Sequence, residues 1–286
     1  LDIKGMLGIN AHGVLGSELF NRFVVEIDYQ NEKIRLYKHD NFKAPKGYKR
    51  MDIEVKSFRP YITVDIKQKG RKRQKFNLLI DSGASSALFL DEQRHEQIDL
   101  PKKTLDHTIG SGITGLLSGK IGRVKKVWLG KHFKFKNVIT SYPQQWKIQT
   151  EVSDRDGTII RHGTLGSDML SRFNVIYDYL NGAVYFKKTK EYKEEFKFNR
   201  AGFTFTALGK ELNQYFIADI IPDSPAEKIG LQPNDEIIAI GNKPVFFYTF
   251  SEINGFLRGD TGTSFDIIIR RNGELFKKTL RLRKLI

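Results

Sequence analysis

Two stretches of the chain repeat one another, and this repeat constrains the fold more than any other feature. Residues 12–36, HGVLGSELFNRFVVEIDYQNEKIRL, align without a gap with residues 162–186, HGTLGSDMLSRFNVIYDYLNGAVYF, at an offset of 150 residues. Identical pairs include His12 and His162 at one end and Tyr29 and Tyr179 further along. A match of this length does not arise by chance, so the chain carries two copies of one structural unit.

Each copy predicts a corner, a short helix and a hairpin. The Leu-Gly-Ser corner permits close backbone approach because glycine has no side chain. Ser17 and Ser167 are the expected N-caps of the helices that follow. In the second copy, FNVIYDY and AVYF predict two strands joined by a turn at Asn181-Gly182. His12 and His162 occupy matched positions, and we expect them to make structural hydrogen bonds rather than to bind metal or catalyse.

The tripeptide Asp81-Ser82-Gly83 directly follows the apolar run FNLLI, which predicts a buried strand. A tripeptide this permissive also occurs in ordinary turns. Its position behind an apolar strand, with the second repeat following downstream, gives it more weight than the tripeptide has alone.

These parts, in this order, resemble the retropepsin-like aspartic proteases. The matching segments are LLIDSGASSALFL, a flap candidate IGSGITGLLSG at 109–119, VKKVWLG at 124–130 and GTLGSDMLSRF. The resemblance covers roughly residues 51–188 as one complete lobe, whereas residues 1–37 match only the final third of such a lobe. It implies the C-terminal part of a first lobe at 1–45 and a complete lobe at 46–190.

The same resemblance implies roles for individual residues. Asp81 is the expected catalytic carboxylate, Ser82 braces the site across to a partner loop, and Gly83 lets backbone N–H groups reach the carboxylate. Ser85 and Ser86 are candidates to hydrogen-bond its outer oxygen. The implied substrate contacts are Ala84, Ser85, Gly110, Ser111, Gly112, Leu165 and Gly166.

This chemistry needs two carboxylates that share one proton and hold the attacking water. The repeat places the second aspartate roughly 70 residues upstream of Leu1. We therefore expect it to come from an upstream first-lobe fragment, or from a second copy of the chain. Since the chain opens with Leu1 rather than Met and shows no signal peptide, we expect its N-terminus to result from processing, from truncation or from deliberate choice of the expressed fragment.

Residues 201–286 resemble a PDZ domain of the bacterial HtrA type. The resemblance rests on YFIADIIPDSPAEKIGLQPNDEIIAIGNKPV, followed by a predicted helix FSEINGFL and a closing hairpin around Asn272-Gly273. The usual Gly-Asp is Asn234-Asp235 here. By resemblance, a peptide binds near Tyr215, Phe216 and Ile217, although the usual Gly-Leu-Gly-Phe pattern is absent there. Bracing the protease lobes is an equally open role.

The formal net charge of +15 is compatible with an anionic partner. Its densest cluster, KQKGRKRQK at 67–75, lies between two strand-like runs and reads as a solvated hairpin tip. We expect no nucleic-acid partner, although binding of nucleic acid or an anionic polymer through Lys67 to Lys75 remains a third hypothesis. No cysteine is present and no metal-ligand spacing occurs, so we expect no metal and no cofactor. No apolar run is long enough to span a membrane.

The sequence thus predicts a mainly β protein: retropepsin- or pepsin-like acid protease β-barrel lobes, one partial and one complete, followed by a PDZ-like β-sandwich with two short helices. The expected function is that of an aspartic endopeptidase acting on a peptide or protein substrate. The alternative is a catalytically inactive, protease-like and PDZ-containing peptide-binding scaffold. By resemblance, the expected location is the periplasm or cell surface of a bacterium.

Overall fold

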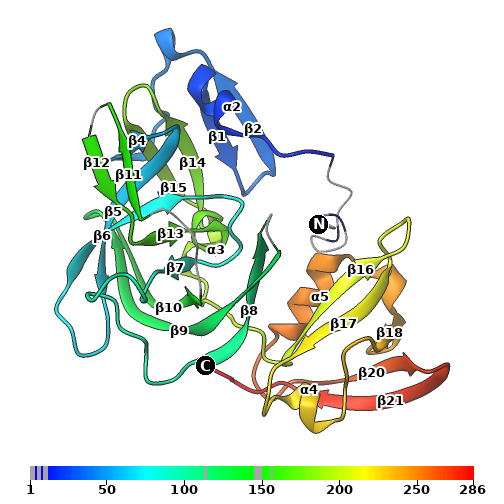
Figure 1. Cartoon of the computed structure of the whole chain (residues 1–286). Coiled ribbons are helices and arrows are strands. Elements are labelled where there is room, and N and C mark those ends of the chain that lie inside the picture. The colour runs from blue at the N-terminus through cyan, green and yellow to red at the C-terminus, as the bar shows by residue number, and fades with distance from the viewer. Residues whose placement is uncertain (1–3, 5–7, 9–11, 113–114, 145–149, 156) are drawn as a thin grey trace. The chain divides into compact units, whose positions relative to one another are not determined.

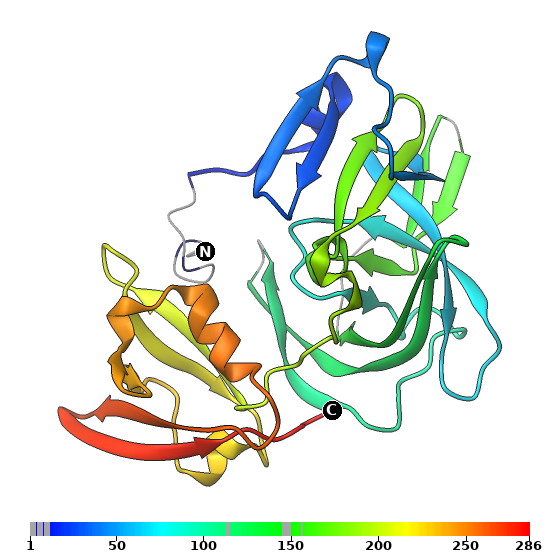
Figure 2. The ribbon, with the colours of Figure 1, turned by 180° about the vertical axis from the view of Figure 1, so that it is seen from behind.

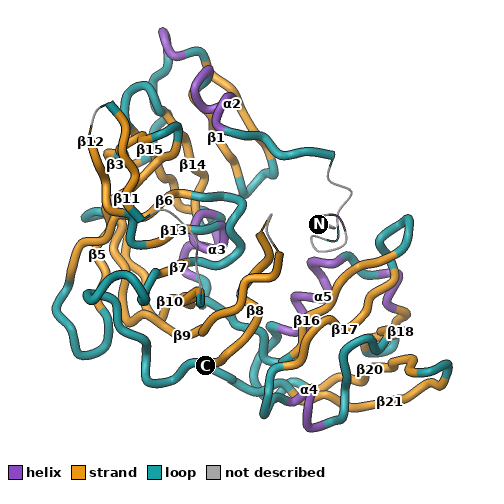
Figure 3. Tube along the Cα trace, viewed as in Figure 1, coloured by secondary structure: helices purple, strands orange, loops and turns teal. Residues whose placement is uncertain are grey.

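The computed structural model describes residues 4, 8, 12–112, 115–144, 150–155 and 157–286. Strands dominate it, as predicted for a mainly β protein (Figure 3). The chain divides into two compact units. The larger unit contains Leu15–Thr104 and Leu116–Phe196, and the other contains Leu1–Val14, Leu105–Gly115 and Lys197–Ile286.

A sheet of eight strands has the order β4-β5-β6-β13-β7-β10-β9-β8, and all of them except β8 belong to the larger unit (Figure 1). In β6, buried side chains alternate with partly exposed ones, so Phe76, Leu78 and Ile80 all enter the core. Strand β13 lies between β6, to which it is parallel, and β7, to which it is antiparallel. A separate hairpin consists of β11 (Glu151–Asp154) and β12 (Gly157–Ile160). The bounds of the eight strands are β4 (Glu54–Lys56), β5 (Arg59–Lys67), β6 (Gln74–Ile80), β7 (Leu88–Leu90), β8 (Leu105–Gly112), β9 (Gly115–Leu129), β10 (Phe133–Pro143) and β13 (Gly163–Leu165).

The second sheet of this unit joins the two repeats. Its order is β2-β1-β14-β15-β3, with β1 (Val24–Asp28) and β2 (Lys33–Tyr37) from the first copy, β14 (Phe173–Asp178) and β15 (Ala183–Lys188) from the second, and β3 (Lys49–Asp52) at one edge. Figure 2 shows the first-copy hairpin and the second-copy hairpin from behind. Both hairpins form as predicted, and in each a buried aspartate, Asp28 or Asp178, accepts hydrogen bonds from the asparagine three residues on.

The pairing between β1 and β14 is symmetric with respect to the repeat. Val25 lies opposite Tyr177, Glu26 opposite Ile176 and Ile27 opposite Val175. Because the offset between the copies is 150 residues, Glu26 lies opposite its own repeat counterpart. A local twofold axis therefore passes between Glu26 and Ile176, and it relates the two copies in the way that a twofold axis relates the subunits of a dimer.

A short helix follows the corner in both copies, as predicted, but neither is capped as expected. Helices α2 (Ser17–Arg22) and α3 (Ser167–Leu170) begin at the serines, and their N-cap residues are Gly16 and Gly166. The prediction of serine N-caps is therefore wrong. The carbonyls of Gly16 and Gly166 accept the first hydrogen bonds of the two helices, from the N–H groups of Leu19 (3.4 Å) and Leu170 (3.0 Å), so each serine lies inside the first turn. Two short 3-10 helices, η1 (His39–Asn41) and η2 (Lys190–Lys193), complete the unit.

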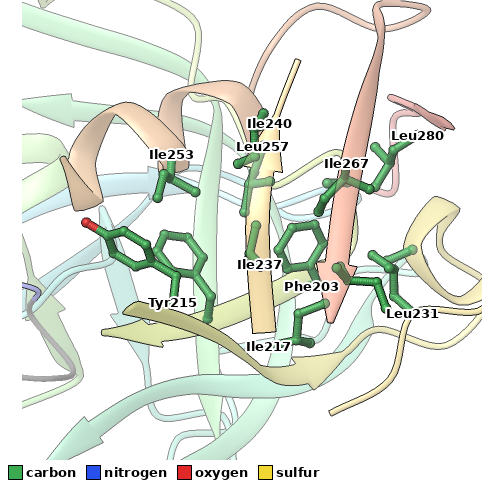
Figure 4. Packing of buried hydrophobic residues seen from close by; sticks show 14 of the residues in the cluster. Phe203, Tyr215, Ile217, Leu231, Ile237, Ile240, Ile253, Leu257, Ile267 and Leu280 are labelled. Carbon is green, nitrogen blue, oxygen red and sulfur yellow. The ribbon is translucent and has the colours of Figure 1, made fainter. Parts of the chain in front are cut away.

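The C-terminal unit has a sheet in the order β16-β17-β18-β20-β21, with β19 paired to β18. Ile253 and Leu257 of helix α5 pack with Phe203, Tyr215 and other residues in one core (Figure 4). The two predicted helices and the closing hairpin are all present. The elements are β16 (Phe203–Leu208), β17 (Gln214–Ile220), α4 (Pro225–Lys228), β18 (Glu236–Ile240), β19 (Lys243–Pro244), η3 (Val245–Phe247), α5 (Phe250–Leu257), β20 (Ser264–Arg271) and β21 (Glu274–Arg281).

The structure shows why Asn234-Asp235 can replace the usual Gly-Asp. Asn234 has φ of +70°, a left-handed conformation that asparagine adopts more readily than most residues. Asp235 is buried and accepts two hydrogen bonds from Arg271, at 2.6 and 2.7 Å. The turn therefore keeps the backbone shape that glycine provides and uses its aspartate to hold the end of β20.

Helix α5 begins with a capping box at Thr249. The hydroxyl of Thr249 accepts from Glu252 N–H (3.2 Å), and Glu252 accepts from Thr249 N–H (2.7 Å). We expect Thr249→Ala to lower the free energy of unfolding by about 1 kcal/mol, the usual contribution of an N-cap side chain. Urea unfolding measures this, with exposed Thr263 changed to alanine as the control. An equal effect of the two substitutions would contradict the assigned cap.

The basic segment 67–75 forms the turn between β5 and β6, with Gly70 at φ of +88°. Its arginines already have acidic partners. Arg71 bonds to Asp99, and Arg73 bonds to Asp65 (2.6 Å) and lies 4.5 Å from the centre of the Trp128 ring. These contacts favour the hairpin tip over a free basic patch. Within the described residues, no helix is long and apolar enough to cross a membrane.

Candidate active site around Asp81

Asp81 lies at the C-terminal end of β6, in a loop held by the corner of the second repeat. The N–H of Asp81 donates to the carbonyl of Leu165 (3.0 Å), and the N–H of Gly166 donates to the carbonyl of Ala87 (3.1 Å). The corner approaches so closely that a Cβ atom on Gly166 would lie 2.1 Å from the carbonyl oxygen of Ser86. Glycine is therefore required at 166, and the packing of β13 against β6 fixes the place of the carboxylate.

Within the loop, the carboxylate of Asp81 accepts a hydrogen bond from the N–H of Gly83 (2.8 Å), as the sequence predicted. This backbone N–H holds the carboxylate in place within the loop. Ser82 is exposed, so its predicted contact with a partner loop stays a prediction.

Two predicted roles are not supported by the contacts. The hydroxyl of Ser86 bonds to that of Ser141 (2.8 Å), so it braces β10 instead of the outer oxygen of Asp81. Leu165 is fully buried, and its carbonyl holds the Asp81 loop, so its side chain is not available to a substrate in this structure. Both residues therefore position the loop. The substrate roles of Ala84 and of the exposed Ser85 stay predictions.

Asp81 and Ser82 open into a pocket of about 400 Å³ that both repeats line. Several of its residues could not be predicted from the motif, because they are distant from Asp81 in the chain. The first repeat contributes its corner and Phe20, and the second contributes Tyr177 and Tyr179. Arg59 lines the pocket from the start of β5. The full lining is Leu15, Gly16, Ser17, Phe20, Ser57, Phe58, Arg59, Pro60, Leu79, Ile80, Asp81, Ser82, Tyr177 and Tyr179.

The two tyrosines of the pocket remain protonated. Burial raises the pKa of Tyr179 well above its usual value, and the negative charge of Asp81 raises it further. Burial likewise raises the pKa of Tyr177, with a smaller contribution from Asp81. The walls beside Asp81 are therefore uncharged aromatic rings, and the carboxylate is the acid-base group of this part of the pocket.

The corner of the first repeat has the same sequence as that of the second but lacks its covering. Val14 and Leu15 are 86% and 68% exposed, whereas their counterparts Thr164 and Leu165 are 2% and 0% exposed. In the second copy these residues form β13, between β6 and β7. Within the described residues, nothing equivalent to β6 and β7 lies on the first corner. A Cβ on Gly16 would meet only the carboxylate end of Glu18.

The flap candidate lies at the ends of β8 and β9. Gly110, Ser111 and Gly112 belong to β8, and the residues after Gly115 belong to β9. Residues 113–114, between the two strands, lie outside the described part of the chain. The predicted role of this segment in covering a substrate stays a prediction.

His162 makes the structural hydrogen bond that its matched position suggested. Its Nδ1 accepts from the N–H of Asn77 (3.1 Å), and its ring lies 4.7 Å from that of His95. Burial, with a smaller contribution from His95, lowers the pKa of His162 to about 4. Its counterpart His12 is exposed.

This histidine makes stability depend on pH. Because the pKa is about 4 in the folded chain and near 6.5 in the unfolded chain, the unfolded state takes up the proton first as the pH falls. The contribution of His162 is therefore present above about pH 6.5 and is lost towards pH 4. We expect His162→Gln to flatten the fall in unfolding free energy over this range, measured by urea unfolding at several pH values. Parallel curves for the two proteins would contradict this role.

Tyr215, Phe216 and Ile217, the predicted peptide contacts, lie on β17. At Tyr215 and Phe216 this strand pairs with β16 on one side and β18 on the other. Tyr215 and Ile217 are buried in the core shown in Figure 4. A strand flanked on both sides offers no free edge to a peptide, and among the described strands the neighbouring open edge is that of β16. The part of these residues in peptide binding stays a prediction.

Two family models match the chain. One, described as aspartyl protease, matches residues 62–169, and the other, described as PDZ domain, matches residues 216–271. The first match includes Asp81 and the corner at Gly166, and the second includes β18 and α5. The chain therefore contains an aspartyl protease domain and a C-terminal PDZ domain.

Curated relatives match shorter stretches. A zinc metalloprotease RasP of Oceanobacillus iheyensis is 35% identical over 66 residues, which are 23% of this chain and 15% of that protein. A probable CtpA-like serine protease of Staphylococcus haemolyticus is 28% identical over 100 residues, which are 34% of this chain and 20% of that protein. The chain thus spans at most a fifth of either relative.

Among solved structures, a retropepsin-like aspartic protease from Rickettsia conorii matches 51% of this chain and 96% of its own length. The identity is 18% and the TM-score is 0.32.

Proposed function

We propose that this chain, which combines an aspartyl protease domain with a C-terminal PDZ domain, supplies one half of an aspartic endopeptidase site. Asp81 is the carboxylate of that half. A second aspartate shares a proton with it, and the pair activates the water that attacks the peptide carbonyl. The ionised carboxylate accepts a proton from the water, while the protonated one donates a hydrogen bond to the carbonyl oxygen.

The local twofold axis between β1 and β14 is the observation that carries the proposal. It relates the corner at Leu165-Gly166, which holds the Asp81 loop, to the corner at Leu15-Gly16. A loop held by the first corner in the same way would therefore face Asp81 across the axis. That first corner lines the pocket at Asp81. A carboxylate held by the first corner would therefore open into the same pocket as Asp81.

The same observation favours an upstream first-lobe fragment over a second copy of this chain as the partner. In a homodimer, β14 would have to pair with another β14. The edge of β14 that this pairing would need is already paired with β1 of the same chain. The exposed side chains of Val14 and Leu15 lie where the strands of an upstream fragment would cover them.

The test is to produce this chain with and without the segment encoded upstream of Leu1, and to measure cleavage of a peptide mixture. We expect cleavage only when the upstream segment is present, and a native mass equal to one copy of each part. Gly16→Ala should abolish the cleavage activity that the upstream segment restores. A Cβ at position 16 would obstruct the backbone carbonyl groups of that segment, as a Cβ at Gly166 would obstruct those of Ala84 and Ser86. Cleavage by a symmetric dimer of this chain alone would overturn the choice of partner.

The same experiment separates the enzyme from the alternative, an inactive peptide-binding scaffold. An upstream segment that restores the pocket but carries a non-acidic residue at the matched position supports the scaffold. In either case, we propose that the PDZ domain binds peptides by adding them to the edge of β16, beside α5. Binding of a labelled peptide to the PDZ domain is measured by fluorescence polarisation on the whole chain. A proline placed in β16 is expected to abolish this binding.

A further inference from the structure

A second cavity lies in the larger unit, away from Asp81. Its volume is about 300 Å³, within the range of small-molecule sites. Leu100, Pro101 and Val124 give it an apolar wall, and Tyr142 at the end of β10 lines it. It shares no lining residue with the Asp81 pocket. The turn at Gln68–Gly70 and Asp81 lie at opposite ends of β6, about 23 Å apart at the usual rise of a strand.

The hydroxyl of Tyr142 is the unusual group of this cavity. The side chain is only 3% exposed, and apart from a side-chain interaction with Thr140 its buried oxygen has no hydrogen-bond partner among the residues that the structure describes. Buried hydroxyl groups are nearly always paired because an unmade hydrogen bond is costly. Burial raises the pKa of Tyr142, and the negative charges of Asp99 and Glu92 raise it further, so the group is a neutral donor. An acceptor on a bound molecule would satisfy it.

The walls of the cavity are held in place by hydrogen bonds. The buried amide of Gln68 donates to the carbonyl of Gln97 (2.7 Å) and accepts from the N–H of Asp99 (2.7 Å). On the opposite wall, Arg123 donates to the carbonyls of Asn137 (2.7 Å) and Phe196 (3.1 Å). The cavity is therefore preformed.

The charges around the cavity favour an anion. Lys69, Lys102 and Arg123 line it, and its one lining acid, Asp99, already forms an ion pair with Arg71. Positive charge is thus in excess beside a neutral hydrogen-bond donor and an apolar wall. A carboxylate attached to an apolar group matches these three features together.

We propose that this cavity binds a small apolar group that bears a carboxylate, with the carboxylate accepting a hydrogen bond from Tyr142. Lys69 and Lys102 supply the positive potential, and the apolar part lies against Leu100, Pro101 and Val124. Two sources have this chemistry: a free organic acid and the C-terminal residue of a peptide.

The test is isothermal titration of the full chain with 3-phenylpropionate. We expect saturable binding that weakens about tenfold in Tyr142→Phe, the usual effect of losing a hydrogen bond to a charged group. The double variant Lys69→Gln/Lys102→Gln should weaken it severalfold. The neutral analogue 3-phenylpropionamide should bind more weakly than the acid. Asp81→Asn should leave binding unchanged, because Asp81 belongs to the other pocket.

Two further arms identify the source and guard against misfolding. A peptide ending in phenylalanine with a free carboxylate, but not its C-terminal amide, should bind if the natural ligand is a peptide end, and binding of the free acid alone indicates a small molecule. Tyr142→Phe should unfold at the same or a higher temperature, since it removes an unpaired buried hydroxyl. Equal binding of acid and amide, unchanged binding in Tyr142→Phe, or no binding at millimolar concentrations would overturn the proposal.

Discussion

Asp81→Asn is expected to lower the rate of peptide hydrolysis by the complete protein about a hundred- to ten-thousand-fold, the usual contribution of a positioned acid-base group. Asparagine keeps the shape of the side chain and can still meet the N–H of Gly83 through its oxygen. It cannot take a proton from water at neutral pH. The loss should therefore appear in kcat, while the unfolding temperature stays close to that of the unmodified protein.

Asp52→Asn is the matched control for this experiment. The side chain of Asp52 is 83% exposed and forms an ion pair with Arg50 at the surface. Neutralising it makes the same chemical change away from the pocket, and activity should persist. Undiminished turnover in Asp81→Asn would rule out the proposed enzyme and leave the peptide-binding scaffold.

Gly166→Ala is expected to lower the free energy of unfolding of this chain by about 3 kcal/mol or more, at the upper end of overpacking effects. The new Cβ would lie 2.1 Å from the carbonyl oxygen of Ser86 and 2.6 Å from that of Ala84. Both are backbone atoms that the β6–β13 packing holds, so neither can move aside without separating the strands. Urea unfolding at neutral pH measures the change.

The repeat supplies the control, because Gly16→Ala makes the identical change in the identical sequence. There the Cβ would meet only the flexible end of Glu18, so we expect a change of less than about 0.5 kcal/mol in this chain. Equal destabilisation by the two substitutions would show that the glycines act through chain entropy and not through the close contact.

Local features of the fold were predictable because neighbouring residues determine them. Helix α5 spans the predicted FSEINGFL, since Thr249 and Glu252 cap its start. The turn at Asn272-Gly273 forms with both residues at positive φ, as its sequence requires. The position of Asp81 behind a buried strand followed from the apolar run before it.

Features that depend on distant partners were not predictable. A period of two shows which face of β17 is buried, but not that β16 and β18 flank it. Likewise, nothing local to Arg59 or Phe20 relates them to Asp81, and only the folded sheets bring them to one pocket. The N-cap predictions failed by one residue in both copies, because the carbonyls of Gly16 and Gly166 accept the first helical hydrogen bonds.

The register of β1 on β14 also determines which chains this strand can accept. At the centre of the pair, buried Glu26 faces Ile176 and receives hydrogen bonds from Tyr37 (2.5 Å) and Tyr48 (2.7 Å). If β1 of one molecule paired in this register with β1 of another, Glu26 would lie opposite Glu26 at the centre of the pair. Like charges directly opposite one another in a sheet repel. Pairing of β1 with a second β1 is therefore disfavoured at Glu26, whereas pairing with β14 sets Glu26 opposite an uncharged isoleucine and so favours the arrangement within one chain.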